Sequence, residues 1–290
     1  MAKLIYVPLG CSLRSQLAEK LSQQPLGEGV LVLPNRLLTD DVRSKYANVE
    51  TMGMDTLAGK LMNLNGGTDY KELSRRSQEL IVQDIIDYMM ENKQLTSMTT
   101  HKQLEYFGSL AHKTGFVKAM TSLVSQLSRC GATKDDIYGQ IQKSFEEDEL
   151  KGKDLGVCNF YLLYRQYLEN NNWYDLEGKY RLAEKMLEKQ DCKIPWKHIY
   201  ICDFFSLDQV QINFLQALAK HVDDLVISMS YEGRRVSSDS KAKYESITKF
   251  MRASTNTVNA LKILGATVAS LAAEELGQAP AGVAMRQLRH

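Results

Sequence analysis

KLIYVPLGCSLRSQ, residues 3–16, is the stretch around which the predicted fold is built. Residues 3–7 predict a buried strand, a loop follows from Pro8, and a helix with a hydrophobic face begins after it. A second stretch, HIYICDFFS at 198–206, is another apolar strand, and it ends in Asp203. The two strands lie far apart in the chain, and we expect them to be neighbours in one parallel sheet.

The first loop keeps the frame of the P-loop pattern G-x-x-x-x-G-K-[ST] over residues 8–15, but not its chemistry. Pro8 and Leu13 stand in place of the two glycines, and Arg14 and Ser15 stand in place of Lys and Ser/Thr. Only glycine lets backbone N–H groups wrap a phosphate without a clash, and proline has no N–H to donate. Tight ATP binding in the usual pose is therefore not expected. Arg14 could still attract an anion at the start of the helix, and an ordinary strand-to-helix loop with one basic residue would look the same.

The end of the second stretch lacks the acid pair of an active helicase ATPase. Such an enzyme carries Asp-Glu, with the Asp on magnesium and the Glu positioning the attacking water, whereas here Asp203 is followed by Phe204. We expect weak or absent hydrolysis, and Asp203 could equally cap the next helix. ATP with magnesium is the ligand that a degenerate nucleotide site would take, but no cofactor, catalytic residue or metal site is assigned. The residues of that degenerate site would be Ser12, Arg14, Ser15 and Asp203.

The composition is that of a globular protein without a strong charge. The 290 residues carry a formal charge of +1 and are 44% hydrophobic, so any contact with nucleic acid must be local. Five cysteines are widely spaced without a C-x-x-C pair, which predicts reduced, mostly buried thiols rather than a zinc site. No apolar run is long enough to cross a membrane, and the first residues lead into a strand rather than a signal peptide. These features predict a cytoplasmic protein.

Strands and helices alternate at both ends of the chain, and helices fill the middle. Residues 1–64 and 191–270 predict one discontinuous α/β domain with a P-loop NTPase-like parallel sheet. Residues 65–190 predict an all-helical insertion, in which the aromatic residues at 160–167 suit helix packing better than base stacking. Residues 271–290 would form a C-terminal tail whose order the sequence leaves open.

Several short matches in a fixed order carry a resemblance to a known family. They are VLVLPN at 30–35, MGMDTLAGKL at 52–61, GFV at 115–117, DFFSLDQ at 203–209, and Phe250 with Thr255, Thr257 and Leu261. With these matches and the helical insertion, residues 3–264 resemble the N-terminal helicase-like region of AddB/RexB, a component of the bacterial AddAB/RexAB ATP-dependent helicase–nuclease.

That resemblance implies a role in DNA repair. In the family, the heterodimeric complex resects double-strand breaks for recombination, and the partner of AddB/RexB is the motor. AddB/RexB has a helicase-like fold that does not drive translocation, helps to bind the strand carrying the recombination hotspot, and holds a PD-(D/E)XK nuclease domain near its C-terminus. This chain departs at Pro8 and Leu13, because many members keep an intact P-loop, and these residues contain no nuclease domain. The resemblance therefore implies a noncatalytic module with a superfamily 1 helicase-like fold that binds single-stranded DNA and the motor subunit.

Polar residues that follow the strands are the candidate DNA contacts. By resemblance to helicase sheets, DNA would cross the carboxyl ends of the strands, where Asn35, Arg36, Thr51 and Thr56 could meet phosphates. These residues could equally be helix caps and solvated side chains. Two alternatives stay open. One is a divergent NTPase that uses the degenerate nucleotide site, and the other is a scaffold whose helical insertion binds the motor subunit without touching nucleic acid.

Overall fold

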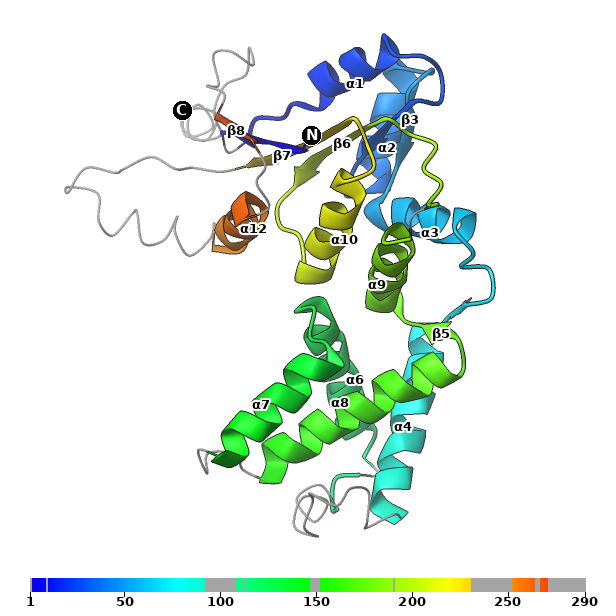
Figure 1. Ribbon diagram of the computed structural model, residues 1–290, viewed down its shortest axis with the longest axis vertical. Coiled ribbons are helices and arrows are strands. Elements are labelled where there is room, and N and C mark those ends of the chain that lie inside the picture. The colour runs from blue at the N-terminus through cyan, green and yellow to red at the C-terminus, as the bar shows by residue number, and fades with distance from the viewer. Residues whose placement is uncertain are drawn as a thin grey trace, which may run out of the picture. The chain divides into compact units, whose positions relative to one another are not determined.

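The computed structural model describes residues 2–8, 10–91, 108–111, 113–146, 152–189, 191–230, 252–263 and 267–270. The chain divides into two compact units, Met1–Gly66 with Tyr180–His290 and Gly67–Lys179 (Figure 1). Each unit has a hydrophobic core of its own. Phe250 and the predicted tail at 271–290 lie outside the described residues.

In the described part of the chain, the first unit holds a six-stranded parallel sheet. The strand order is β3-β2-β6-β7-β1-β8, and the pairings between neighbours are parallel. This confirms the prediction of an α/β architecture with a parallel sheet. The strands are β1 (Ala2–Val7), β2 (Gly29–Val32), β3 (Glu50–Met52), β6 (His198–Phe204), β7 (Asp224–Ser230) and β8 (Thr267–Ser270).

The prediction that the strands at 3–7 and 198–202 are neighbours is wrong, because β7 lies between β1 and β6. Ile227 of β7 is opposite Leu4 of β1 on one side and opposite Ile201 of β6 on the other. Residues 225–229 of β7 are all buried, and a strand that is buried at every inner position needs a central place with both faces covered. β1 and β6 are therefore one strand apart, and the segments that follow them must bridge that distance if their residues are to meet.

Helices cover both faces of this sheet. α1 (Arg14–Ser22) and α2 (Arg36–Lys45) share one core cluster with side chains of β1, β2 and β6. The connections from β1 to β2 and from β2 to β3 run toward one edge, whereas those from β6 to β7 and from β7 to β8 run toward the other. Because parallel crossovers are right-handed, α10 (Gln209–Ala219) and α12 (Arg252–Ile263) lie on the face opposite α1 and α2. α3 (Met54–Leu64) follows β3, and α9 (Leu176–Leu187) ends in this unit.

The second unit is mainly helical. α4 (Arg75–Glu91), α6 (Thr114–Arg129) and α8 (Gly152–Asn170) pack around a common core, and α7 (Lys134–Glu146) packs against α8. Phe160, Tyr161 and Tyr164 are buried in that core, which agrees with the predicted packing role of the aromatic residues at 160–167. Among the described helices of either unit, none has the length and hydropathy needed to cross a membrane.

The expectation of an all-helical segment is wrong in one detail. β4 (Lys71–Glu72) and β5 (Trp173–Tyr174) form a two-stranded parallel sheet in the second unit. The N–H of Lys71 donates to Asn172 O at 2.9 Å, and the N–H of Leu73 donates to Tyr174 O at 2.8 Å. A strand of two residues is too short to show the alternation of apolar and polar residues from which strands are predicted.

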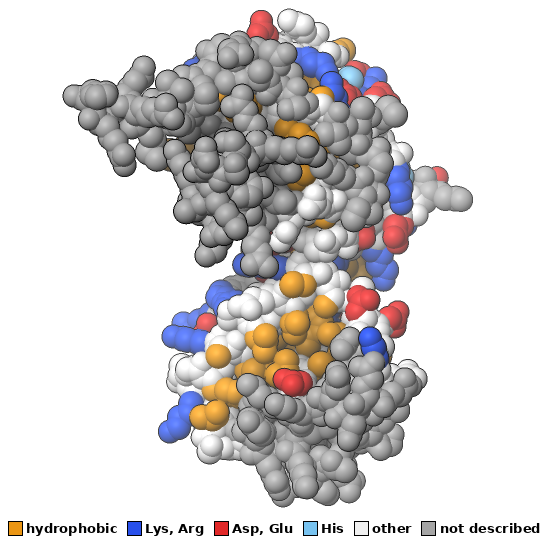
Figure 2. All heavy atoms as spheres, turned by 90° about the vertical axis from the view of Figure 1, so that its left-hand side faces the viewer, with side chains coloured by type: hydrophobic (Ala, Val, Ile, Leu, Met, Phe, Trp, Pro, Cys, Tyr) orange, Lys and Arg blue, Asp and Glu red, His pale blue; other side chains and the backbone are white. Residues whose placement is uncertain are grey.

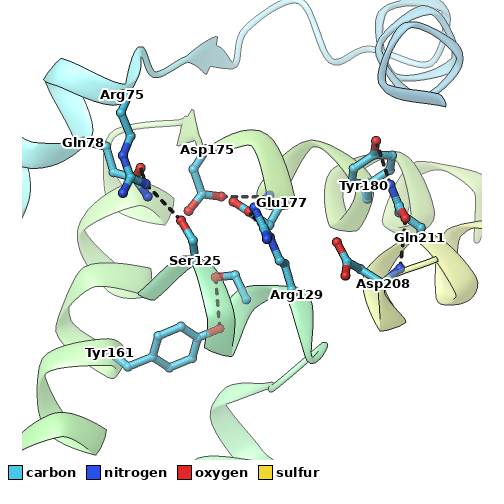
Figure 3. Close-up of polar contacts among 12 residues, drawn as sticks. Arg75, Gln78, Ser125, Arg129, Tyr161, Asp175, Glu177, Tyr180, Asp208 and Gln211 are labelled. Atoms are coloured by element: carbon cyan, nitrogen blue, oxygen red, sulfur yellow. Dashed lines mark hydrogen bonds and ion pairs between the residues drawn. The ribbon is translucent and has the colours of Figure 1, made fainter. Parts of the chain in front are cut away.

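A buried polar network fixes the start of α9 within the second unit (Figure 3). The Asp175 carboxylate accepts the N–H of Gly178 at 2.7 Å and the hydroxyl of Tyr164 at 2.9 Å. Arg129 donates to Glu177 at 3.0 Å. Burial, and after it the charge of Asp175, raises the pKa of the Glu177 carboxyl. Because these buried groups are hydrogen-bonded, they fix the geometry of the first turn of α9.

Candidate functional site at the carboxyl ends of the strands

The loop between β1 and α1 is a tight turn anchored by packing. The N–H of Cys11 donates to Pro8 O at 3.0 Å, and Gly10 has a φ of +85°, which glycine adopts without strain. The side chains of Cys11 and Leu13 are buried in the core cluster beneath α1 and α2. Leu13 stands where a P-loop has its second glycine, and here it holds the loop against the sheet.

Asp203 is turned toward this loop by an irregularity at the end of β6. The register between β6 and β7 shifts between Ile201 and Phe204. Asp203 itself has a φ of +64°, in the left-handed region that Asp tolerates better than most residues. Irregularities of this kind re-aim a side chain at a strand end. The Asp203 carboxylate accepts hydrogen bonds from Ser12 Oγ at 2.5 Å and from Arg14 Nη1 at 2.6 Å.

Arg14 lies between two acids. Besides its bond to Asp203, its Nη2 lies 3.7 Å from Asp41 Oδ2 on α2. The side chains of Arg14 and Asp203 are 23% and 15% exposed, so solvent screens this pair only in part. A hydrogen bond from Lys45, with smaller contributions from the charges of Lys45 and Arg14, lowers the pKa of Asp41. A guanidinium and a carboxylate thus neutralise each other beside the carboxyl ends of β1 and β6.

This cluster has the chemistry of a closed ion pair. A magnesium ion would need the Asp203 carboxylate and a phosphate would need the Arg14 guanidinium, but the two groups are engaged with each other through Arg14 Nη1. Arg14 Nε is buried without a hydrogen-bond partner among the described residues. Ser12 belongs to the same cluster, whereas Ser15 is exposed on α1. Burial, and after it the charge of Asp203, raises the pKa of the Cys202 thiol, and this side chain is fully buried. The side chains present do not fit a magnesium nucleotide in the P-loop pose. We therefore assign no hydrolysis step to these residues.

Three of the four candidate DNA contacts, Asn35, Arg36 and Thr56, follow the carboxyl ends of β2 and β3, whereas Thr51 lies within β3. Asn35 caps α2, with its Oδ1 accepting the N–H of Leu38 at 3.0 Å, and the Arg36 side chain is 92% exposed. Thr56 is exposed in the first turn of α3. Thr51 differs, because it is 2% exposed and its hydroxyl is enclosed by protein. A phosphate cannot reach Thr51 in this fold, so its position does not support the expected DNA contact.

Comparison with known proteins gives the chain a family. The family described as "ADDB, N-terminal" matches residues 15–288. The chain belongs to this family. Membership confirms the resemblance to the N-terminal region of AddB/RexB that the short sequence matches carried.

The curated relatives of this chain are distant in sequence and much longer. Each of the following is named as the B subunit of an ATP-dependent helicase/deoxyribonuclease. The protein of Clostridium tetani (strain Massachusetts / E88) is 21% identical over 192 residues, which is 64% of this chain and 15% of the relative. That of Alkaliphilus metalliredigens (strain QYMF) is 20% identical over 225 residues, 75% of this chain and 18% of the relative. That of Staphylococcus saprophyticus is 19% identical over 235 residues, 76% and 19% respectively. The chain thus spans less than a fifth of the length of these relatives.

Two residues near the site escaped sequence reasoning. Asp41 reaches Arg14 from α2, but nothing in the sequence distinguishes one acid among those of an exposed helix face. Phe205 follows Asp203 closely and is 38% exposed. The sequence did contain a sign that Phe205 is exposed. It is the second of two aromatic residues after Asp203, where the strand ends, and a residue beyond the end of a strand need not be part of the core.

Proposed function

We propose that this chain is a noncatalytic, helicase-like module of a helicase–nuclease in DNA repair, and that it binds single-stranded DNA and a motor subunit. Its sheet would be a P-loop NTPase-like sheet of the superfamily 1 helicase type, with residues 65–190 as an insertion. The ion pair between Arg14 and Asp203 is the observation that carries the proposal. Family membership supports the setting, because relatives are named as a component of an ATP-dependent helicase/deoxyribonuclease.

Opening the ion pair for a nucleotide would be unfavourable. Both side chains are less than a quarter exposed, and Asp203 accepts a further hydrogen bond from Ser12. A hydrogen bond to a charged group contributes about 1.5–3 kcal/mol, and magnesium and phosphate would have to replace two of them. The loop offers little in return, because Pro8 has no N–H and Leu13 is buried. These contacts support weak nucleotide binding or none.

The surface that we propose for DNA lies at the carboxyl ends of β2, β3 and β6. Arg36 would pair with a phosphate beside the positive end of the α2 dipole. Asn35 and Thr56 would hydrogen-bond phosphate or sugar oxygens, and the exposed ring of Phe205 would stack on a base. Because the whole chain carries only +1, we expect few phosphate contacts and a correspondingly modest salt dependence.

For the motor subunit we propose a contact on the second unit. Hydrophobic side chains gather on one face of this unit (Figure 2). Contiguous exposed apolar surface on a globular unit is typical of a protein interaction site. This surface supports a protein partner in addition to DNA.

Two titrations test the proposal. A fluorescent single-stranded oligonucleotide and, separately, a fluorescent ATP analogue with Mg²⁺ are titrated with the chain at about 50 and 200 mM salt. We expect DNA binding that weakens with salt, and no binding of nucleotide. Arg36→Ala should weaken DNA binding. Arg76→Ala, which removes an exposed arginine from the second unit, should leave it unchanged.

Other outcomes favour the alternatives. Nucleotide binding with turnover would contradict the noncatalytic assignment and favour a divergent NTPase that uses Arg14, Ser15 and Asp203. Binding of neither ligand would favour a scaffold that contacts only the motor subunit. If Arg36→Ala and Arg76→Ala reduce the affinity for DNA equally, the carboxyl ends of the strands are not the DNA surface.

A further inference from the structure

A thiol and an imidazole meet on the surface of the first unit, outside the candidate site. Sγ of Cys192 lies 3.2 Å from Nδ1 of His221. Cys192 is half-buried in the segment before β6, and His221 is exposed just after α10. A nucleophile and a base within hydrogen-bond reach are the elements of covalent chemistry at sulfur, because the base can take the thiol proton.

Both side chains belong to segments that hydrogen bonds hold in place. Asn65, at the end of α3, accepts the N–H of Lys193 at 2.6 Å and donates to Lys193 O at 3.0 Å. The N–H of His221 donates to Leu218 O at 3.0 Å, and the next residue, Val222, is buried. The meeting of the two side chains is therefore part of the fold of this unit.

The thiol also borders a cavity of about 330 Å³, which is lined by Leu64, Asn65, Lys189, Asp191, Cys192 and Lys193. Cavities of this volume accept small ligands. Two lysines against one aspartate give the lining an excess of positive charge, and this favours small molecules that carry carboxylates.

We propose that Cys192 is a nucleophilic thiol that exchanges with small, anionic disulfides in this cavity. His221 Nδ1 takes the proton from Sγ, and the resulting thiolate attacks one sulfur of the disulfide. The S–S bond of the ligand breaks as a new S–S bond to Cys192 forms, and the departing thiolate takes the proton back from the imidazolium. The exchange needs no further oxidant, because the small disulfide supplies the oxidised sulfur. Its product is a reversible mixed disulfide on Cys192.

The other cysteines provide the comparison. Burial raises the pKa of the thiols of Cys11 and Cys202. Burial, and after it the charge of Asp154, raises the pKa of the Cys158 thiol. Cys130 is exposed at the end of α6, and its thiol has no imidazole partner among the described residues. Cys130 is thus an internal control for an accessible thiol without a base.

Incubation of the full chain with oxidised glutathione, followed over time by peptide mass spectrometry, tests the proposal. Cys192 should acquire the mixed disulfide at least about tenfold faster than Cys130. His221→Gln should remove most of that difference and leave the rate at Cys130 unchanged. An uncharged disulfide, bis(2-hydroxyethyl) disulfide, should show a smaller preference for Cys192. The double substitution Lys189→Gln and Lys193→Gln should reduce the preference for glutathione to that level.

Equal rates at Cys192 and Cys130 in the unaltered chain would overturn the reactive pair, and this comparison does not depend on how any variant folds. A rate at Cys192 that His221→Gln leaves unchanged would overturn the role of the imidazole. Equal preference for the charged and the uncharged disulfide would overturn the role of the lysines in selecting anions.

Discussion

Replacing Arg14 by Met should lower the free energy of unfolding of the first unit by about 2 kcal/mol. The substitution keeps a long side chain but removes the guanidinium that donates to Asp203 at 2.6 Å. Asp203 is 15% exposed, and among the described residues it would keep only its bond from Ser12. Loss of a hydrogen bond to a charged group costs about 1.5–3 kcal/mol. The 23% exposure of Arg14 gives partial screening, which places the loss below the upper end of that range.

Urea unfolding followed by tryptophan fluorescence measures this loss. The chain has two tryptophans. In a Trp173→Phe background the signal comes from Trp196, which is 3% exposed in the core of the first unit. Arg36→Met is the matched control, because its side chain is 92% exposed and its acidic neighbour Asp40 lies 3.5 Å away. The control should change the free energy of unfolding by less than about 0.5 kcal/mol.

A double-mutant cycle separates the ion pair from lost packing. Asn adopts the left-handed backbone conformation of residue 203 about as readily as Asp, so Asp203→Asn removes the charge without new strain. In that background Arg14→Met should cost at least about 1 kcal/mol less than in the unaltered chain. If Arg14→Met costs no more than Arg36→Met, or costs the same with and without the Asp203 charge, the ion pair does not hold the β1–α1 loop to β6.

Three further predictions concern single side chains. Tyr164→Phe should destabilise the second unit by about 1–3 kcal/mol, because Asp175 stays buried with one donor fewer. Urea unfolding followed by Trp173 fluorescence measures this change. An unchanged midpoint would show that the hydrogen bond from Tyr164 to Asp175 does not stabilise the unit. The raised pKa of Glu177 contributes stability that is fully present below its unfolded value of about 4.3 and is lost as pH rises through the folded value. The second unit should therefore lose stability across that window in the unaltered chain but not in Glu177→Gln, and identical pH profiles would count against the buried carboxyl. Phe205→Ala should weaken binding of a single-stranded oligonucleotide by about 1–3 kcal/mol for one stacked base. Unchanged affinity in the titration of the fluorescent oligonucleotide would show that Phe205 is not part of the DNA surface.

Local elements and family membership followed from the amino-acid sequence alone. The apolar run at 30–33 is typical of a strand covered on both faces, and all of its side chains are buried. The loop after β1 and the helix that follows it could also be predicted from the sequence. Turn residues and hydrophobic spacing are local signals that involve only a few neighbouring positions. The family match rests on the same kind of information, since it depends on the order and spacing of short segments.

The neighbours of each strand, and the contacts of individual polar side chains, were decided by tertiary packing. β7 took the place between β1 and β6, and Thr51, expected at the surface, is enclosed in the fold. Asp203 and Arg14 lie 189 positions apart in sequence, and they meet because the irregular end of β6 turns the carboxylate toward the loop after β1. A pattern of apolar and polar residues predicts whether a side chain is buried. It does not predict which residue, distant in sequence, packs against that side chain or neutralises its charge. Strand order and the aim of one side chain depend on the packing of the whole sheet, and so they became visible only in the folded chain.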